Sequence, residues 1–329
     1  MKKLKIGFVI FLTALSLNLF SQVKLIFDTD FGGDADDLGA LAMLHHLAAK
    51  GECELLAIMC WATEQNAVPA IDAVNRFYKH PDVPVGVRKE GSYFDSTSYS
   101  KPIAENFHHE LNHQTAIDAT VLYRKILAES DDKSITIVVV GPLKNIENLI
   151  RSKGDIYSEF DGKTLISKKV KEFVIMGGQY PEGKKEWNFD GNMPGITRYV
   201  IQNIDVPITF SGFELGVNIK TGEVFNQIDK NTPLYVGFKY FSEHAAWMKQ
   251  HYKGQILNNS TYDQTAVLYT VRNGLGIYWD RSENGVCLPD EVGGNKWQEN
   301  RDGKHSFLKL KMSNNEMAQL IESLMLGNF

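Results

Sequence analysis

The chain has 329 residues, of which 43% are hydrophobic and 23% are charged, and this composition is typical of a folded protein with a large core. The formal net charge is -5, and the sequence has no long run of like charges. It therefore lacks the excess of basic residues that is typical of nucleic-acid-binding proteins. A small molecule is therefore the expected partner.

The N-terminus has the pattern of an export signal. Three lysines lie among the first five residues, an apolar run follows from Ile6 to Phe20, and Ser21 is a small residue suited to cleavage. The run is short for a membrane span of about 20 residues, so we expect no stable membrane anchor. The sequence thus predicts a signal peptide over residues 1–21 and an exported protein, periplasmic or secreted. Residues 22–329 contain no linker and are predicted to form one domain.

Strand-like apolar runs alternate with segments of helical periodicity along the rest of the chain. The predicted strands are Val23–Phe27, Glu54–Cys60, Val83–Val87, Ile135–Val140, Phe173–Met176 and Pro207–Phe210. The predicted helices are Leu38–Lys50, Val68–Lys79, Asp118–Ala128, Phe238–Gln250, Gln264–Val271 and a last one after the capping-box pattern at Ser313. Strands that are apolar throughout are covered on both faces, which predicts an α/β fold with an open, mostly parallel central sheet flanked by helices. The turn-rich span Gly274–Gly303 is either a β-rich excursion or a loop near the site.

An acidic loop follows the first strand directly. Residues 28–37 read Asp-Thr-Asp-Phe-Gly-Gly-Asp-Ala-Asp-Asp, which places five carboxylates in ten residues. Like charges this close raise one another's pKa values, and a bound cation would relieve the repulsion. Ligands that are all oxygen favour Ca²⁺ or Mg²⁺, and the lack of His and Cys argues against zinc. In open parallel sheets, ligands bind beyond the carboxyl ends of the strands, where this loop begins.

Other interpretations of the loop are weaker. An EF-hand needs a ligand at the fifth position and a carboxylate at the twelfth, which counted from Asp28 are Gly32 and Gly39. A phosphoryl-transfer enzyme with an aspartyl nucleophile and a solvated helix turn without function both stay open.

The acidic loop resembles the D-x-D-P-G-x-D-D signature of the inosine-uridine-preferring nucleoside hydrolases. Phe31 replaces the proline and the loop is two residues longer, a variant that resembles secreted bacterial members. Five further segments match in the family's order, namely Asn66 with Asn75, Gly141–Asn145, Met176–Gly178, Glu186–Asn188 and Tyr262–Val267. The resemblance implies a Rossmann-like nucleoside hydrolase architecture.

The same resemblance assigns roles to the acidic and amide residues. It implies a Ca²⁺ ion held by Asp30, Asp37, the main-chain carbonyl of Val140, and Asp263. It implies that the ribose hydroxyls are bound by Asp36, Asn66, Glu186 and Asn188. Asp28 is expected to orient the loop, and Asp34 inherits no role.

The implied reaction is hydrolysis of the N-glycosidic bond of a ribonucleoside, or of a related N-ribosyl compound, to free base and ribose, as in purine and pyrimidine salvage. A water on the metal, activated by Asp30, would attack a sugar with oxocarbenium character. Where the family carries a histidine as the leaving-group acid, this chain has Tyr262. Activation of the leaving group therefore stays open between Tyr262, the histidines 108, 109 and 113, and stacking by Trp187 or Trp61.

Two other functions remain as alternatives. The first is a non-catalytic or divergent ribose- or nucleoside-binding protein of the same fold. The second is a Mg²⁺-dependent phosphohydrolase. Base preference is left open by the sequence, as is a homo-oligomeric state.

Overall fold

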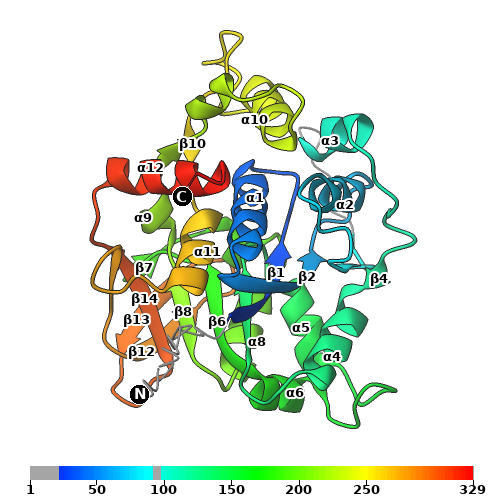
Figure 1. Cartoon of the computed structure of the whole chain (residues 1–329). Coiled ribbons are helices and arrows are strands. Elements are labelled where there is room, and N and C mark those ends of the chain that lie inside the picture. The colour runs from blue at the N-terminus through cyan, green and yellow to red at the C-terminus, as the bar shows by residue number, and fades with distance from the viewer. Residues whose placement is uncertain (1–21, 92–97, 329) are drawn as a thin grey trace, which may run out of the picture.

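The computed structural model describes residues 22–91 and 98–328, so the signal peptide predicted over residues 1–21 lies outside the described part of the chain. The described residues form one 12-stranded sheet with helices on both faces, and a small two-stranded sheet (Figure 1). This architecture confirms the predicted α/β fold class. Within the described ranges, no helix has both the length and the apolar character that crossing a membrane requires.

The main sheet is parallel over most of its width. Its order is β4-β3-β2-β1-β5-β6-β8-β14-β12-β13-β7, with β11 beside β14. The strands from β4 to β14 in this order pair in parallel, whereas the pairs formed by β11, β12, β13 and β7 are antiparallel. The strands are β1 Val23–Thr29, β2 Cys53–Cys60, β3 Val85–Val87, β4 Ile117–Asp118, β5 Ile135–Val139, β6 Val170–Met176, β7 Glu182–Gly183, β8 Ile208–Ser211, β9 Lys220–Thr221, β10 Asn259–Ser260, β11 Trp279–Arg281, β12 Gly285–Pro289, β13 Asn295–Glu299 and β14 His305–Leu310.

Helices alternate with strands in the first part of the chain, from β1 to β5, and less regularly after it. They are α1 Asp36–Ala49, α2 Ala67–Phe77, α3 Ser100–Asn106, α4 Ala119–Glu129, α5 Lys144–Arg151, α6 Gly162–Lys169, α7 Trp187–Asp190, α8 Ile196–Asn203, α9 Phe213–Gly216, α10 Pro233–His244, α11 Asp263–Arg272 and α12 Asn314–Met325, with a 3₁₀ helix at Glu223–Gln227. The capping box predicted at Ser313 is confirmed, because its side chain accepts from the Glu316 N–H while Glu316 accepts from the Ser313 N–H.

Side chains of β1 alternate between two hydrophobic cores, one on each face of the sheet. Leu25 and Phe27 belong to one core and Ile26 to the other, and all three are completely buried. The first core is shared with α1, α2, α11 and α12, and the second with α4, α5, α6 and α8. The predicted coverage of both sheet faces is therefore confirmed.

Several elements differ from the sequence prediction. The helix predicted at Phe238–Gln250 is instead α10, which begins earlier because Thr232 caps it and Pro233 occupies its first turn. The span Gly274–Gly303 is the β-rich excursion, since it contains β11, β12 and β13. Short helices such as α5, α6 and α8 were not predicted, nor was β14.

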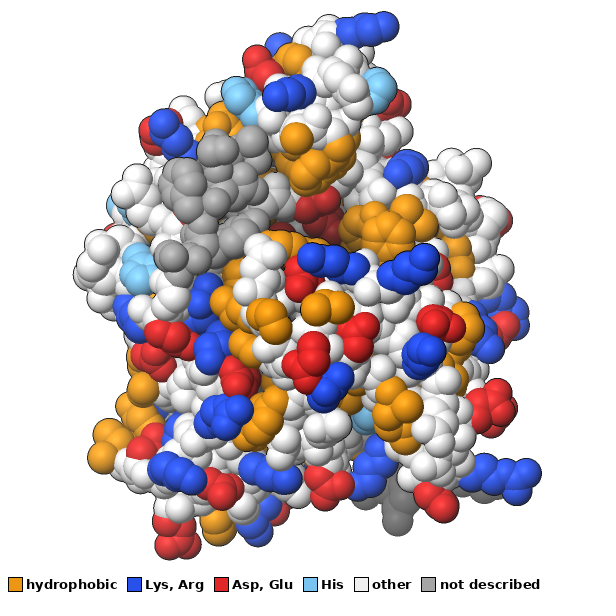
Figure 2. Space-filling model, turned by 180° about the vertical axis from the view of Figure 1, so that it is seen from behind, with side chains coloured by type: hydrophobic (Ala, Val, Ile, Leu, Met, Phe, Trp, Pro, Cys, Tyr) orange, Lys and Arg blue, Asp and Glu red, His pale blue; other side chains and the backbone are white. Residues whose placement is uncertain are grey.

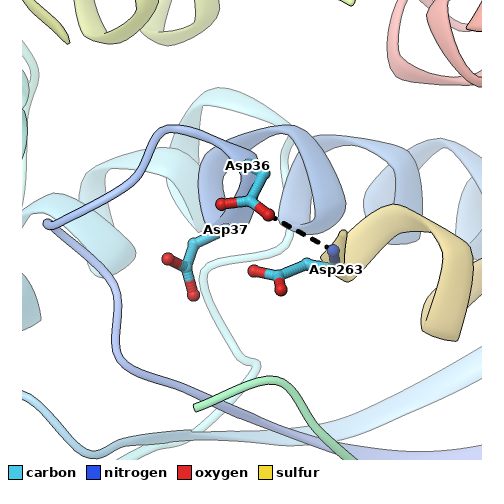
Figure 3. Close-up of side chains that lie close together, drawn as sticks. All are labelled: Asp36, Asp37 and Asp263. Atoms are coloured by element: carbon cyan, nitrogen blue, oxygen red, sulfur yellow. Dashed lines mark hydrogen bonds between the residues drawn. The ribbon is translucent and has the colours of Figure 1, made fainter. Parts of the chain in front are cut away.

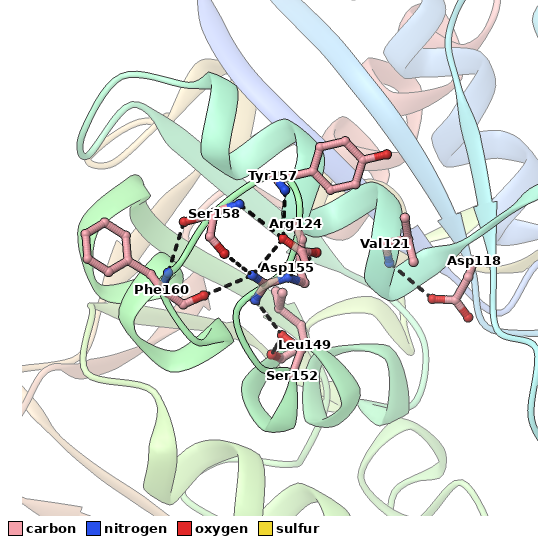
Figure 4. Close-up of polar contacts among 9 residues, drawn as sticks. All are labelled: Asp118, Val121, Arg124, Leu149, Ser152, Asp155, Tyr157, Ser158 and Phe160. Atoms are coloured by element: carbon pink, nitrogen blue, oxygen red, sulfur yellow. Dashed lines mark hydrogen bonds and ion pairs between the residues drawn. The ribbon is translucent and has the colours of Figure 1, made fainter.

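Arg124 on α4 organises the end of the molecule away from the carboxyl ends of the strands (Figure 4). Its guanidinium donates to both carboxylate oxygens of Asp155, at 2.7 and 3.1 Å, and to the main-chain carbonyls of Ser158 and Phe160. A bidentate pair with further hydrogen bonds satisfies a nearly buried cation. This arrangement fixes the loop that joins α5 to α6.

Candidate active site

A cavity of about 440 Å³ opens beyond the carboxyl ends of β1, β5 and β6. In the space-filling view, acidic side chains lie inside a hollow that hydrophobic side chains border (Figure 2). The cavity has the size and position expected for a ligand site in an open α/β sheet. Its lining residues are Asp30, Gly33, Asp34, Asp36, Asp37, Val140, Met176, Lys185, Glu186, Trp187, Asn188, Phe213, Trp247, Tyr262 and Asp263.

The structure brings nearly all of the predicted site residues together in this cavity. The exception is Asn66, which is not among the lining residues and sits at the N-terminus of α2. Its N–H donates to Oε2 of Glu64 at 2.8 Å, and the other oxygen of Glu64 accepts from the Ser98 hydroxyl at 2.9 Å. Asn66 therefore lies beside the site rather than in its wall.

Three carboxylates meet between two helix N-termini. Asp36 and Asp37 begin α1 and Asp263 begins α11, and each offers an oxygen such that the three oxygens lie within 4.8 Å of one another (Figure 3). Asp36 Oδ2 accepts from the N–H groups of Tyr262 and Asp263, at 3.2 and 3.3 Å. Helix N-termini favour negative charge, which explains how the fold holds three acids so close together.

Burial and mutual repulsion act on the protonation of this cluster. Burial raises the pKa of Asp36 to about 6, and burial together with the neighbouring carboxylates raises the pKa of Asp37 and of Asp263 well above the usual range. The atoms that could bind a metal ion in this cluster are carboxylate oxygens, and the main-chain carbonyl of Val140 lies in the same cavity wall. Such a set fits a hard cation, whose charge would offset the repulsion.

Asp30 lies in the cavity wall but outside the group of three. Its Oδ2 accepts a hydrogen bond of 2.8 Å from the indole Nε1 of Trp187. Burial raises the pKa of Asp30 to about 7, against the lowering effect of the Trp187 bond. A carboxyl with a pKa near neutrality is suited to accept a proton at physiological pH.

Glu186 shapes the segment that carries Trp187 and Asn188. Its carboxylate accepts from the N–H groups of Asn188 and Phe189, which caps α7, and from the N–H of Gly178 at 2.9 Å. Burial nevertheless raises the pKa of Glu186 to about 7. Gly178 has a φ of +73°, and a side chain there would meet the Phe189 ring.

Asn188 connects two strand ends to the cavity. Its amide nitrogen donates to the main-chain carbonyls of Val140, at 2.9 Å, and Met176, at 3.1 Å. The carbonyl of Val140, predicted as a metal ligand, is thus held in place by a predicted ribose-binding residue. A carbonyl oxygen has a second lone pair, so this bond leaves one for a ligand.

Aromatic rings form the other side of the cavity. Phe213 and Tyr262 stack with their centroids 5.3 Å apart, and Trp187 and Trp247 are 38% and 53% exposed. Burial raises the pKa of the Tyr262 hydroxyl to about 12, against the lowering effect of a hydrogen bond with Ser260 and with a smaller contribution from the nearby carboxylates. Sequence reasoning missed Phe213 and Trp247, because each is a single aromatic residue without a surrounding motif.

The other candidates for leaving-group activation lie elsewhere. None of the histidines 108, 109 and 113 lines the cavity; they belong to the irregular segment after α3. Trp61 is completely buried under the Arg88 guanidinium, which lies 4.5 Å from its ring. Trp61 therefore packs in the core, and the three histidines lie outside the cavity lining.

Two acids of the loop support it. Asp28 is completely buried and accepts from the Tyr123 hydroxyl at 2.8 Å and from Asn145 Nδ2 at 3.0 Å, in agreement with its expected role in orienting the loop. Asp34, to which the resemblance assigns no role, accepts from Asn259 Nδ2 at 2.6 Å. This bond ties the loop to β10.

Comparisons with known proteins agree on one family. A family model described as inosine-uridine preferring nucleoside hydrolase matches residues 25–304. A purine-preferring ribonucleoside hydrolase from Gardnerella vaginalis superposes with a TM-score of 0.68 at 15% identity, covering 93% of this chain and 99% of that one. An inosine-uridine preferring nucleoside hydrolase from Bacillus anthracis gives 0.65 at 13% identity, covering 93% and 99%.

A third similar structure is that of the type III effector protein XopQ complexed with adenosine diphosphate ribose. It gives a TM-score of 0.65 at 14% identity and covers 94% of each chain. A comparison with curated proteins gives no match.

Proposed function

Because the chain belongs to the inosine-uridine preferring nucleoside hydrolase family, whose members are metal-dependent N-glycosidases acting on ribonucleosides, we propose that it hydrolyses an N-riboside with the help of Ca²⁺. The observation that carries this proposal is the convergence of the loop acids with Asp263 in one cavity. The family favours N-glycosidic hydrolysis over the phosphohydrolase alternative.

Asp37 and Asp263, with Asp30 and the carbonyl of Val140, would hold the ion. The support is chemical, since all four offer oxygen, the preferred ligand of Ca²⁺, among carboxyl groups whose mutual repulsion a cation would offset. In such a site Ca²⁺ supplies positive charge and positions water and a sugar diol. Asp36, which begins the same helix as Asp37, is left to bind ribose.

Ribose binding is assigned to Asp36, Glu186 and Asn188. Their carboxylate and amide oxygens can accept from hydroxyl groups, while the amide nitrogen of Asn188 donates to the Val140 and Met176 carbonyls. Asn66, expected here from the resemblance, does not line the cavity, so we do not include it in the direct contacts.

Asp30 is proposed as the general base. It would take the proton from the water that attacks the anomeric carbon, while the neighbouring carboxylates favour the positive charge that develops on the sugar. Trp187 donates to Oδ2 of the same carboxylate, which leaves Oδ1 and a second lone pair of Oδ2 to accept the proton.

The aromatic residues of the cavity are proposed to assist the departure of the nucleobase. The Tyr262 hydroxyl can donate a hydrogen bond to a leaving base, although a pKa of about 12 makes it a weak proton donor at neutral pH. The ring of Tyr262, stacked on Phe213, can also hold the base in position.

The test is release of base from a panel of ribonucleosides, with and without a chelator, by the wild-type protein and by Asp30→Ala and Asp263→Ala. We expect activity that needs Ca²⁺ and a loss of about 10²-fold or more in kcat for Asp30→Ala, as for removal of a general base. Full turnover in chelator would remove the metal from the mechanism.

A second candidate is a ribose-binding protein without catalysis. It is favoured by Tyr262 at the position of the family's histidine and by the similarity to an effector structure that contains adenosine diphosphate ribose. Calorimetry that detects nucleoside or ribose binding, in a protein that releases no base, would support this candidate.

Export over residues 1–21 is a further proposal, supported by the lysines and the apolar run of the sequence. N-terminal sequencing of the mature protein from its native host tests it, with a new N-terminus near Gln22 as the expected result.

A further inference from the structure

Four aromatic side chains border the cavity, and they come from four different parts of the fold. Trp187 begins α7, Phe213 begins α9, Tyr262 precedes α11, and Trp247 lies in the turn that follows α10. The exposed fractions of Trp187, Phe213 and Trp247 lie between 37% and 53%, so their ring surfaces remain available to a ligand. Aromatic faces carry negative potential and attract cations as well as flat apolar rings.

The same cavity has a strong excess of acidic groups. Six carboxyl groups line it, those of Asp30, Asp34, Asp36, Asp37, Glu186 and Asp263. The one basic side chain of the described lining is Lys185, and its ammonium lies 3.0 Å from Asp190 Oδ2. A single divalent ion would offset two negative charges, so the cavity stays attractive to a cationic ligand.

The described part of this lining lacks an imidazole, the side chain that most often protonates a leaving group. None of the described residues that line the cavity is a histidine, and the sequence of residues 92–97, which are not described, contains neither histidine nor lysine. A neutral purine or pyrimidine leaves as an anion unless it receives a proton. A leaving group that already carries a positive charge has no such need.

We propose that the preferred substrate is an N-riboside with a cationic aromatic leaving group, of the ribosylpyridinium class, held between the aromatic rings and the carboxylates. This proposal rests on the proposed N-riboside hydrolysis and specifies its substrate. Water adds to the anomeric carbon, and the C–N bond breaks with its electron pair going to the ring nitrogen, which becomes neutral. The water proton goes to Asp30, so the products are ribose, a neutral pyridine and one proton. No other reactant is needed.

Kinetics on three kinds of riboside test the proposal at saturating Ca²⁺. The probes are 1-ribosyl-3-carbamoylpyridinium, the neutral nucleosides inosine and uridine, and 4-nitrophenyl riboside, whose leaving group needs no protonation. We expect kcat/KM for the pyridinium to exceed that for inosine and uridine by about 100-fold, the size of a general-acid contribution. Equal or faster hydrolysis of inosine or uridine overturns the inference and leaves the proposed function standing. Hydrolysis of none of the probes overturns both.

Binding measurements with unreactive ligands test whether the cavity recognises the positive charge, independently of how easily the leaving group departs. The 1-methyl-3-carbamoylpyridinium ion and neutral 3-methylbenzamide have the same shape and differ in the ring charge. In calorimetry with ribose present, we expect the cation to bind about 10-fold more tightly, as for a partly desolvated cation–π contact. Equal affinities would overturn the recognition of charge.

A matched set of variants localises the effect. Trp247→Leu removes a ring and is expected to weaken binding of the cation by about 5-fold or more, whereas Trp247→Phe keeps a ring face and restores most of it. Phe77→Leu, an exposed aromatic on α2 outside the cavity lining, serves as the control and should leave both affinities unchanged. Equal weakening of the cation and of 3-methylbenzamide by Trp247→Leu would also contradict the proposal.

Discussion

The indole Nε1 of Trp187 donates to Oδ2 of Asp30 at 2.8 Å, although 157 residues separate the two in the chain. The bond connects the proposed general base to the aromatic side of the cavity. Because it stabilises the charged form of the carboxylate, it lowers the pKa of Asp30.

Replacing this indole is expected to shift the pH dependence of the reaction. In Trp187→Phe the donor is lost, so the pKa of Asp30 rises and the acidic limb of kcat/KM moves to higher pH. Trp247→Phe, which removes an indole from the same cavity without touching Asp30, is the control and should keep the wild-type limb. If the acidic limb of Trp187→Phe stays at the wild-type pH, the hydrogen bond from Trp187 does not set the pKa that controls catalysis.

The carboxylate cluster is expected to respond to Asp263→Asn in two opposite ways. Without metal, removal of one charge relieves repulsion, so the variant should have a higher Tm in chelator than the wild-type protein. With Ca²⁺, the wild-type Tm should rise and the variant's should change little, because a ligand has been lost. Differential scanning calorimetry measures both.

Asp34→Asn is the matched control for this cluster, because it removes a charge from the same cavity outside the group of three. We expect it to retain the Ca²⁺-dependent increase in Tm. A lower Tm of Asp263→Asn in chelator would mean that Asp263 has only a structural role.

Tyr123→Phe is expected to destabilise the loop without entering the cavity. The Tyr123 hydroxyl is one of two donors to the completely buried Asp28, so its loss should cost about 1–3 kcal/mol in the free energy of unfolding. Urea unfolding measures the cost, and Tyr157→Phe in a surface loop is the control. A neutral effect would mean that Asn145 alone satisfies Asp28.

Buried His305 is expected to account for part of the loss of folding stability at low pH. Burial lowers its pKa from 6.5 to about 4, and its Nδ1 accepts from the Cys287 N–H. The unfolded chain binds the proton at higher pH than the folded one, so stability is complete above pH 6.5 and falls as the pH drops toward 4. The full loss corresponds to about 3 kcal/mol.

His305→Gln should remove this part of the pH dependence. The measurement is urea unfolding at pH 7 and pH 4.5, where the variant should lose less stability than the wild-type protein. His244→Gln, an exposed histidine at the end of α10, is expected to behave like the wild-type protein. Equal losses in all three proteins would exclude His305 as a source.

The central sheet was predictable because its strands are apolar throughout and its helices periodic. Ile135–Val139 and Phe173–Met176 illustrate this, since burial on both faces leaves a largely apolar run in the sequence. In contrast, β14 reads His-Ser-Phe-Leu-Lys-Leu, and its parallel pairing with β8 depends on a partner almost 100 residues earlier. Local patterns carry no information about such a pairing.

The acidic half of the site was also predictable, because Asp28–Asp37 lies in one stretch of sequence. The aromatic half was not, because Phe213 and Trp247 reach the cavity from separate elements and carry no motif. The ribose contact predicted for Asn66 stays a prediction. In the fold Asn66 lies outside the cavity lining, and its main-chain N–H donates to Glu64.

The pairing of α1 with α11 also affects the order in which the protein becomes functional during synthesis. Asp36 and Asp37 leave the ribosome early, but the third carboxylate of the cluster, Asp263, is added 226 residues after Asp37. A nascent or truncated chain that ends before α11 lacks this carboxylate, however well its first strands have folded. The proposed metal site is thus complete only after α11 has been synthesised.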